Sequence, residues 1–370
     1  RDELPTEHGI AHFAEHGLFK GTTHRKSYQV NCRLENLGGE LNAFTTKEDT
    51  TVHATVLRND FPKAVELLSD VVFNSTFPDK ELDKEREVII DEINTYKDSP
   101  MDMIYDTFED MLFEGSELGH NILGRKRDLM RHDSAALHRF VDRTYTTDQM
   151  VFASIGNISD SRIEQIANRY FADYKPTTRS HTRAVTTICA PFDREQIKHT
   201  HQAHCIIGNR AYSINEDKRV PFLLLVNILG GPTANSRLNV SVRERNGLSY
   251  NIEANYTAYN DCGMAVIYFS SEHCNSDHCR QIIADEIKKL QTVRLTTRQL
   301  AMAKRQYIAQ MTISTEGNEG YMLGVGRSLL VHGEVDTLEE AYKKINAVTA
   351  DQIMEVANEI FTNNSTLIYR

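Results

Sequence analysis

The chain has 370 residues, of which 40% are hydrophobic and 25% are charged, a composition typical of a globular protein with two or three domains. Its formal net charge of −10 argues against a nucleic-acid partner, which would require a basic stripe on the surface. The sequence contains no run of about 18 uncharged apolar residues, so we expect no membrane-spanning segment and no membrane partner. Six cysteines are too sparse for a disulfide scaffold, so the cysteine count does not decide between a reducing and an oxidising cellular compartment.

The first half predicts several helices around one early pair of strands. A first helix is expected from Thr6, whose side chain suits the N-cap, towards Phe19. The other elements are assigned from hydrophobic periodicity, β-branched residues and turn residues. They are helices near 27–37, 60–74, 78–97, 101–113, 135–144 and 160–173, and strands near 41–46, 50–57 and 150–158.

The best domain boundary lies in residues 174–193, which contain Pro176 and Pro191 and show no clear periodicity. We therefore predict an N-terminal domain at 1–178, a linker at 179–194 and a C-terminal domain at 195–370. The second half repeats the order of elements seen in the first. Its expected elements are strands at 197–207, 248–259 and 264–270, helices at 217–229, 276–293, 297–314 and 337–360, and a last strand starting near residue 365.

The two halves can be aligned through their long helices, because residues 77–82 correspond to residues 295–300 and similar elements precede each. This pattern indicates an internal duplication. The predicted fold class is α+β, with two homologous domains that each contain a mostly antiparallel sheet covered by helices.

An H-x-x-E-H pentapeptide runs from His12 to His16. On a helix, residues four apart lie on one face, so the two imidazoles can share a metal ion. Glu15 is placed to reach a metal-bound water, which is the inverted form of the H-E-x-x-H arrangement of zinc peptidases. A match of this kind also arises by chance in a chain with 15 histidines, so its context decides its meaning.

The long helix at 78–97 supplies that context. Glu85 and Glu92 are seven residues apart and share one helix face, while Leu82, Ile89 and Ile93 mark the helix as largely buried. Buried carboxylates require a cationic partner. Glu92 is the candidate third zinc ligand, and Glu85 is the candidate acceptor for a ligand imidazole. Without the upstream pentapeptide, a solvated acidic face would be the preferred interpretation.

These residues make the chain resemble the pitrilysin/insulin-degrading family of zinc peptidases. It is most similar to the short form typified by mitochondrial processing peptidase and bacterial processing-peptidase-like proteins. The resemblance covers nearly the whole chain, including Gly9–His16, Phe19–Thr22 and the 75 residues that separate His16 from Glu92. It implies one Zn²⁺ ion held by His12, His16 and Glu92, with Glu15 as the general base.

The resemblance also implies residues that contact a substrate. The segment Leu41–Thr45 is similar to the family's edge strand, which binds the substrate backbone by strand addition, so Asn42, Ala43 and Phe44 are candidates. The segment Val242–Tyr250 is similar to the one that offers an arginine and a tyrosine near the metal. Those positions correspond to Arg243 and Tyr250.

The chain departs from the family pattern at two places. The family has one or two strands before the region that begins here at Arg1, so the chain looks truncated or incompletely represented. Gly17 stands where a larger apolar residue is usual, and we expect looser packing behind His16. In the second half, Ala303 and Gln310 align with Glu85 and Glu92, which predicts one metal site per chain.

The implied function is zinc-dependent hydrolysis of peptides or unfolded segments inside an enclosed chamber. The resemblance implies that the chain is one lobe of a clamshell, with a homodimer or a heterodimer with an inactive paralogue as the assembly. Two alternatives stay open: a catalytically silent structural subunit, and a peptide-binding module with structural zinc. A separate cluster of four possible ligands at 273–279 lacks the second paired arm of a zinc finger.

Overall fold

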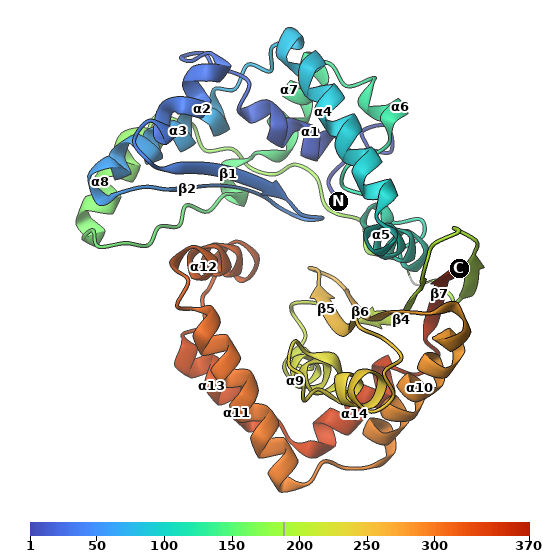
Figure 1. Cartoon of the computed structure of the whole chain (residues 1–370). Helices are drawn as coiled ribbons and strands as arrows, with labels where there is room; N and C mark the ends of the chain where they lie inside the picture. The colour runs from blue at the N-terminus through green and yellow to red at the C-terminus, as the bar shows by residue number, and fades with distance from the viewer. Residues whose placement is uncertain (188) are drawn as a thin grey trace. The chain divides into compact units, whose positions relative to one another are not determined.

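A computed structural model describes residues 1–187 and 189–370, which divide into two compact units (Figure 1). The first unit contains residues 1–98, 120–184 and 318–333, and the second contains residues 99–119, 185–317 and 334–370. These units differ from the predicted division because each takes one segment from the other half. The predicted linker includes residue 188, and that part of it lies outside the described residues.

The first unit is mainly helical and carries one two-stranded antiparallel sheet, in which Glu40 pairs with Thr55 and Thr45 with Thr50. Apolar side chains of its helices form two cores, one around α1 and α4 and one between α2 and α3. Its elements are α1 (Ile10–Leu18), α2 (Ser27–Glu35), β1 (Glu40–Thr45), β2 (Thr50–Thr55), η1 (Arg58–Asp60), α3 (Phe61–Phe73), α4 (Asp79–Asp98), α6 (Lys126–Leu129), α7 (Ser134–Thr144), η3 (Thr147–Gln149), α8 (Asp160–Phe171) and α12 (Asn318–His332).

The second unit contains a five-stranded sheet in the order β3-β7-β4-β6-β5, in which only the β3–β7 pair is parallel. Successive residues of β4 face opposite sides, so Ile207 packs in the core with α9, α10 and α14 while Ile206 packs against α5. Its elements are α5 (Pro100–Leu112), η2 (Glu117–Gly119), β3 (Asp193–Gln196), β4 (Ala203–Ala211), α9 (Arg219–Gly230), the π-helix η4 (Asn239–Glu244), β5 (Ile252–Ala258), β6 (Gly263–Ser271), η5 (His273–Asn275), α10 (Ser276–Thr292), α11 (Thr297–Ser314), α13 (Leu338–Ala347), α14 (Ala350–Ile360) and β7 (Ser365–Tyr369).

The structure confirms the α+β class and most predicted elements, but three predictions are wrong. Residues 150–158 form no strand, and Phe152 and Ile155 are partly exposed. The predicted strand at 197–207 begins only at Ala203, and His199, between β3 and β4, has a positive φ of 51°. The predicted helix at 337–360 is two helices, α13 and α14.

Helix α12 was not predicted, and it packs with the first unit although it comes from the second half of the chain. Glu319 at its start accepts a hydrogen bond from Thr55 at 3.0 Å and lies 3.6 Å from His53, both on β2. Arg327 lies 3.7 Å from Asp49 in the β1–β2 turn. Within the described part of the chain, no helix combines the length and apolar character that a membrane crossing needs.

A buried carboxylate fixes the segment that follows α1 onto α3. Asp70 is 4% exposed and accepts hydrogen bonds from Thr22 at 2.8 Å, His24 at 2.7 Å and Arg25 at 2.6 Å. Burial alone would raise the pKa of Asp70, but these three hydrogen bonds outweigh burial and lower it. A lowered folded-state pKa means that ionised Asp70 stabilises the fold above the pKa of the unfolded chain, about 3.9.

We expect Asp70→Asn to reduce the free energy of unfolding at pH 7 by about 3 kcal/mol, because it removes the charge that Arg25 and His24 contact. The difference from the unmodified protein should shrink as the pH falls below about 4, where Asp70 of the unfolded chain becomes protonated, and vanish below the lowered folded-state pKa of Asp70. Urea unfolding at several pH values measures both effects. Asp91→Asn, at an exposed position on α4, is the control, and an equal loss in the two variants at pH 7 would contradict the prediction.

Candidate metal centre

Helix α1 presents an apolar side to the core and a polar side that carries His12, Glu15 and His16. Ile10, Phe13, Ala14 and Leu18 are fully buried in the core shared with α4 and α7. The helix begins after Gly9, whose φ of 86° suits glycine and whose Cα lies against the backbone of residues 123 and 124. Glu3 caps this end, because its carboxylate accepts hydrogen bonds from the backbone amides of Gly9 and Ala11 at 3.0 and 2.9 Å.

The polar side brings three predicted ligands together. The Nε2 atoms of His12 and His16 lie 3.2 Å apart, as expected for residues one helical turn apart. Glu92 Oε2, from α4, lies 3.7 Å from the His12 Nε2 atom and 3.9 Å from the His16 Nε2 atom. One ligand atom from each of the three residues lies within 4.8 Å of the others. All three residues belong to the first unit.

Glu85 also reaches this site from α4, where it lies on the same helix face as Glu92. Its Oε1 lies 2.8 Å from His16 Nδ1, so the ring can donate from Nδ1 and present Nε2 as an acceptor. Its Oε2 lies 2.5 Å from Lys20 Nζ. Burial alone would raise the pKa of Glu85, but the hydrogen bonds from His16 and Lys20 outweigh it and lower the pKa. An ionised Glu85 therefore holds the His16 ring in place.

The donor set suits a zinc ion. Burial, with a smaller effect of His16, lowers the pKa of His12 to about 4, so its imidazole is neutral near pH 7, as a metal ligand must be. Two nitrogens that each lie 2.0–2.1 Å from one tetrahedral zinc ion are about 3.3 Å apart, close to the observed separation of the Nε2 atoms. Two imidazoles and one carboxylate are also a known ligand set of catalytic zinc.

Glu15 lies beside these ligands and is 8% exposed. Its Oε2 accepts a hydrogen bond from Thr45 Oγ1 at 2.5 Å. Burial raises the pKa of Glu15, and the hydrogen bond from Thr45 opposes that effect. A carboxylate whose pKa is raised is a better proton acceptor when ionised, which suits general-base chemistry.

Two known protein families match this chain. Residues 1–126 match the family described as Insulinase (Peptidase family M16), and residues 133–307 match the family described as Peptidase M16 inactive domain. Together these matches cover most of the chain. The chain belongs to the M16 peptidase family.

Relatives and solved structures agree with the M16 assignment. The chain is 31% identical over 371 residues to the Bacillus subtilis protein named uncharacterized zinc protease YmxG, covering 99% of this chain and 89% of that protein. It is 30% identical to an uncharacterized zinc protease of Rickettsia felis, with 99% and 88% covered. A crystal structure of a protease from Helicobacter pylori shares the fold, with a TM-score of 0.89 and 17% identity over 100% of this chain and 90% of that chain.

One M16-based expectation about Gly17 is wrong. We expected looser packing behind His16, but the ring of Phe77 fills the space that a larger residue would occupy. A Cβ atom at Gly17 would lie 2.6 Å from the Phe77 ring and 3.3 Å from Leu137. Phe77 is 1% exposed and has a φ of 45°, so an uncommon backbone conformation accompanies this close packing.

The predicted substrate-contacting residues lie in both units. On β1, Asn42 and Phe44 are exposed and Ala43 faces inward, as the alternation of a strand requires. In the second unit, the Arg243 guanidinium lies 4.8 Å from the centre of the Tyr250 ring, and Tyr250 is 81% exposed. Arg243 lies on the π-helix η4, a form that is frequent at functional sites.

The second unit has a neutral residue at the position that aligns with the candidate ligand Glu92. Gln310, which aligns with Glu92, accepts a hydrogen bond from Asn227 of α9 at 2.9 Å. In the predicted cluster at 273–279, His273 contacts the carbonyl oxygen of Thr200 and Cys279 is buried in the core. Among the described residues, that cluster does not bring three ligand atoms together.

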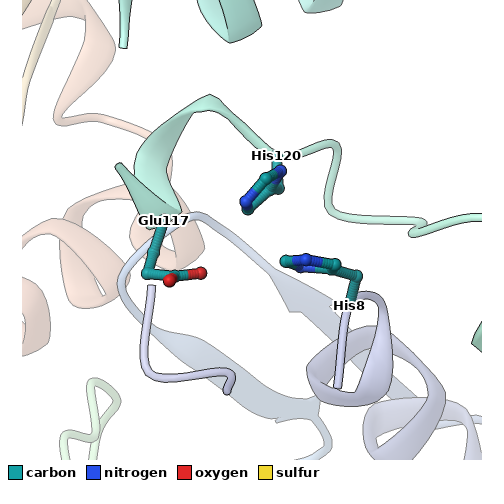
Figure 2. Close-up of side chains that lie close together, drawn as sticks. All are labelled: His8, Glu117 and His120. Carbon is teal, nitrogen blue, oxygen red and sulfur yellow. The ribbon is translucent and has the colours of Figure 1, made fainter. Parts of the chain in front are cut away.

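Two further histidines of the first unit lie close together and were not predicted. Figure 2 shows them, His8 and His120, together with Glu117 of the second unit. The rings of His8 and His120 have centres 3.9 Å apart. Glu117 is assigned to the second unit and the two histidines to the first, so this group carries no functional assignment here.

Sequence reasoning missed three residues that support the centre, Glu3, Lys20 and Thr45. Lys20 and Thr45 lie in segments that carry the family resemblance, but a sequence pattern does not say which side chains meet. Glu3 gave no signal, because its capping of α1 depends on the path of residues 4–8.

Proposed function

We propose that the chain is a zinc-dependent endopeptidase. The observation that carries this proposal is the convergence of His12, His16 and Glu92, with the Glu15 carboxylate beside them. Membership of the M16 family and relatives named as zinc proteases support it. We further propose one zinc ion per chain, since Ala303 and Gln310 of the second unit stand at the positions that align with Glu85 and Glu92.

The residues of the site have different roles in the proposed reaction. A zinc ion held by the three ligands would supply Lewis acidity to a peptide carbonyl. Glu15 accepts the proton of the attacking water and passes it to the leaving amine. Glu85 holds the ring of His16 through Nδ1, which keeps Nε2 directed at the site. This arrangement performs the hydrolysis of a peptide bond.

Substrate contacts are proposed for β1 and for the Arg243–Tyr250 pair. The exposed Asn42 and Phe44 would flank a peptide added along the edge of β1, with Ala43 between them. The Tyr250 hydroxyl and the Arg243 guanidinium are hydrogen-bond donors that suit a developing oxyanion or the substrate backbone. The high exposure of Tyr250 leaves it available to another molecule.

We propose that a processing-peptidase-like homodimer encloses a chamber, with Arg243 and Tyr250 acting on the zinc of the other subunit. Mixing Glu15→Gln and Tyr250→Phe proteins tests this arrangement. If the pair acts between subunits, random dimers should recover about a quarter of the activity, because half are mixed and each mixed dimer has one complete site. No recovery would mean that Glu15 and Tyr250 act within the same subunit. If the true assembly is a heterodimer with an inactive paralogue, the chain alone would show no activity until that partner is added.

A second candidate is a catalytically silent structural subunit, which the match of residues 133–307 to a family described as inactive brings to attention. The presence of the three ligand types and Glu15 in one unit favours the enzyme. A structural zinc site is closed by four protein ligands, and among the described residues this group has three.

Elemental analysis and a quenched fluorogenic peptide test the proposed function. We expect about one zinc per chain and peptide cleavage that stops on addition of a chelator and returns with zinc, because the three ligands form a site that is open on one side. Zinc without cleavage would favour the silent subunit, and a protein that binds no zinc would overturn the proposal.

A further inference from the structure

We propose that Thr45 is a positioning residue that holds the Glu15 carboxylate in its working orientation and joins it to the β1–β2 hairpin. This inference rests on the proposed function for the role of Glu15. It extends that function to a residue that contributes no ligand and no proton.

The contact between the two residues is short and enclosed. Thr45 Oγ1 donates to Glu15 Oε2 at 2.5 Å, and Glu15 is 8% exposed. Within the described part of the chain, Thr45 is the hydrogen-bond partner of this carboxylate. A glutamate side chain has three rotatable bonds, and fixing them costs conformational entropy. A hydrogen bond to a charged group is among the stronger hydrogen bonds of proteins and offsets this entropy cost, so this contact can select one orientation of the carboxylate.

The position of Thr45 is itself fixed by the hairpin. Thr45 is the last residue of β1 and pairs with Thr50, the first residue of β2, and their hydroxyl oxygens lie 3.2 Å apart. The turn between them is closed by Thr46, whose amide donates to the carbonyl of Asp49 at 2.8 Å. The Thr46 hydroxyl donates to the Asp49 carboxylate and accepts from the amide of Glu48. These bonds leave the turn, and therefore Thr45, little freedom.

Long side chains tie this turn to distant parts of the first unit. The Glu48 carboxylate lies 2.8 Å from Arg1 and 3.2 Å from Arg183. Lys47 Nζ donates to the carbonyl of His120 at 2.5 Å. A turn held at several points is a rigid support, and the accuracy of a catalytic group depends on such a support.

Thr45 also follows the residues proposed to contact substrate. Phe44 is exposed and Thr45 faces inward, so neighbouring residues of one strand would contact the peptide and the general base. The hairpin therefore fixes the distance between the bound peptide backbone and the base. A misplacement of about 1 Å can lower a rate about 100-fold, so the loss of this support should act on kcat.

Thr45→Val and Thr45→Ser test the inference. Valine removes the hydroxyl and keeps the β-branched shape, so we expect kcat to fall about 10- to 100-fold while KM changes less than about 2-fold and zinc content stays near one per chain. Serine keeps the hydroxyl and should restore kcat to within about 3-fold of the unmodified protein. Crystal structures should show the Glu15 carboxylate displaced in Thr45→Val and in place in Thr45→Ser.

Thr51→Val is the matched control, because Thr51 lies on the same hairpin and its hydroxyl makes no hydrogen bond to the described residues. An unchanged kcat in Thr45→Val, a Thr45→Ser variant as impaired as Thr45→Val, or an undisplaced Glu15 carboxylate would each overturn the inference. An unmodified protein that binds zinc and cleaves no peptide would instead contradict the proposed function. The crystal structures of the two Thr45 variants would then still test whether Thr45 orients the Glu15 carboxylate.

Discussion

Glu15→Gln should retain about one zinc per chain and lower kcat for peptide hydrolysis by about 10²–10⁴-fold. Glutamine keeps the size of glutamate, and its side-chain oxygen can still accept the hydrogen bond from Thr45. It cannot accept the proton of the attacking water at neutral pH. The variant therefore separates proton transfer from metal binding, and zinc analysis together with steady-state kinetics on one peptide measures the two.

The control for this variant is Glu87→Gln, which makes the same change at an exposed position of α4. It should keep both zinc and activity. A Glu15→Gln protein with an unchanged rate would show that another group accepts the proton. If the zinc were lost as well, Glu15 would be contributing to metal binding.

Glu92→Gln should have the opposite pattern, losing zinc and, with it, activity. Glu92 contributes the carboxylate oxygen 3.7 and 3.9 Å from the two imidazoles, and a neutral amide is a much weaker zinc ligand. We expect the zinc content after dialysis to fall at least about 10-fold, as the loss of a charged ligand implies. The Glu92 side chain is 36% exposed, so the metal-free fold should tolerate the change.

Thermal unfolding of metal-free Glu92→Gln and of the metal-free unmodified protein checks whether the variant is folded. Their midpoints should agree to within about 2 °C, because an exposed substitution rarely changes stability by more than about 0.5 kcal/mol. A large fall in the midpoint would mean that Glu92 supports the fold. Retention of one tightly bound zinc would remove Glu92 from the ligand set and mean that another residue is the third ligand.

The elements that sequence predicted well are those whose stability is local. The long helices α4, α10 and α11 have clear periodicity and polar residues at their starts, and their observed bounds lie within a few residues of those expected. Residues 150–158 have the composition of a strand, but a strand requires a neighbour to complete its hydrogen bonds. Helix α12 was missed because three glycines weaken its helix propensity, and its packing on the first unit compensates for that weakness.

The candidate site was predicted in part for the same reason. Spacing of four residues brings His12 and His16 together on any helix, and a spacing of seven places Glu85 and Glu92 on one face. The pairing of Thr45 with Glu15 depends on how the hairpin packs on α1, which no periodicity encodes. The space behind Gly17 is likewise filled by Phe77, a residue sixty positions away.

The path of the chain through the first unit has a consequence for its biosynthesis. Residues 1–184 contain both strands and all other helices of that unit described here, but α12 arrives only with residues 318–332. A ribosome adds about 5–20 residues per second, so β2 waits roughly 13–50 seconds for the contacts that Glu319 makes with Thr55 and His53. During that interval the hairpin is uncovered on the side that α12 later occupies, and a chaperone or a neighbouring nascent chain can reach it. A fragment that stops at residue 184 would keep that surface permanently exposed.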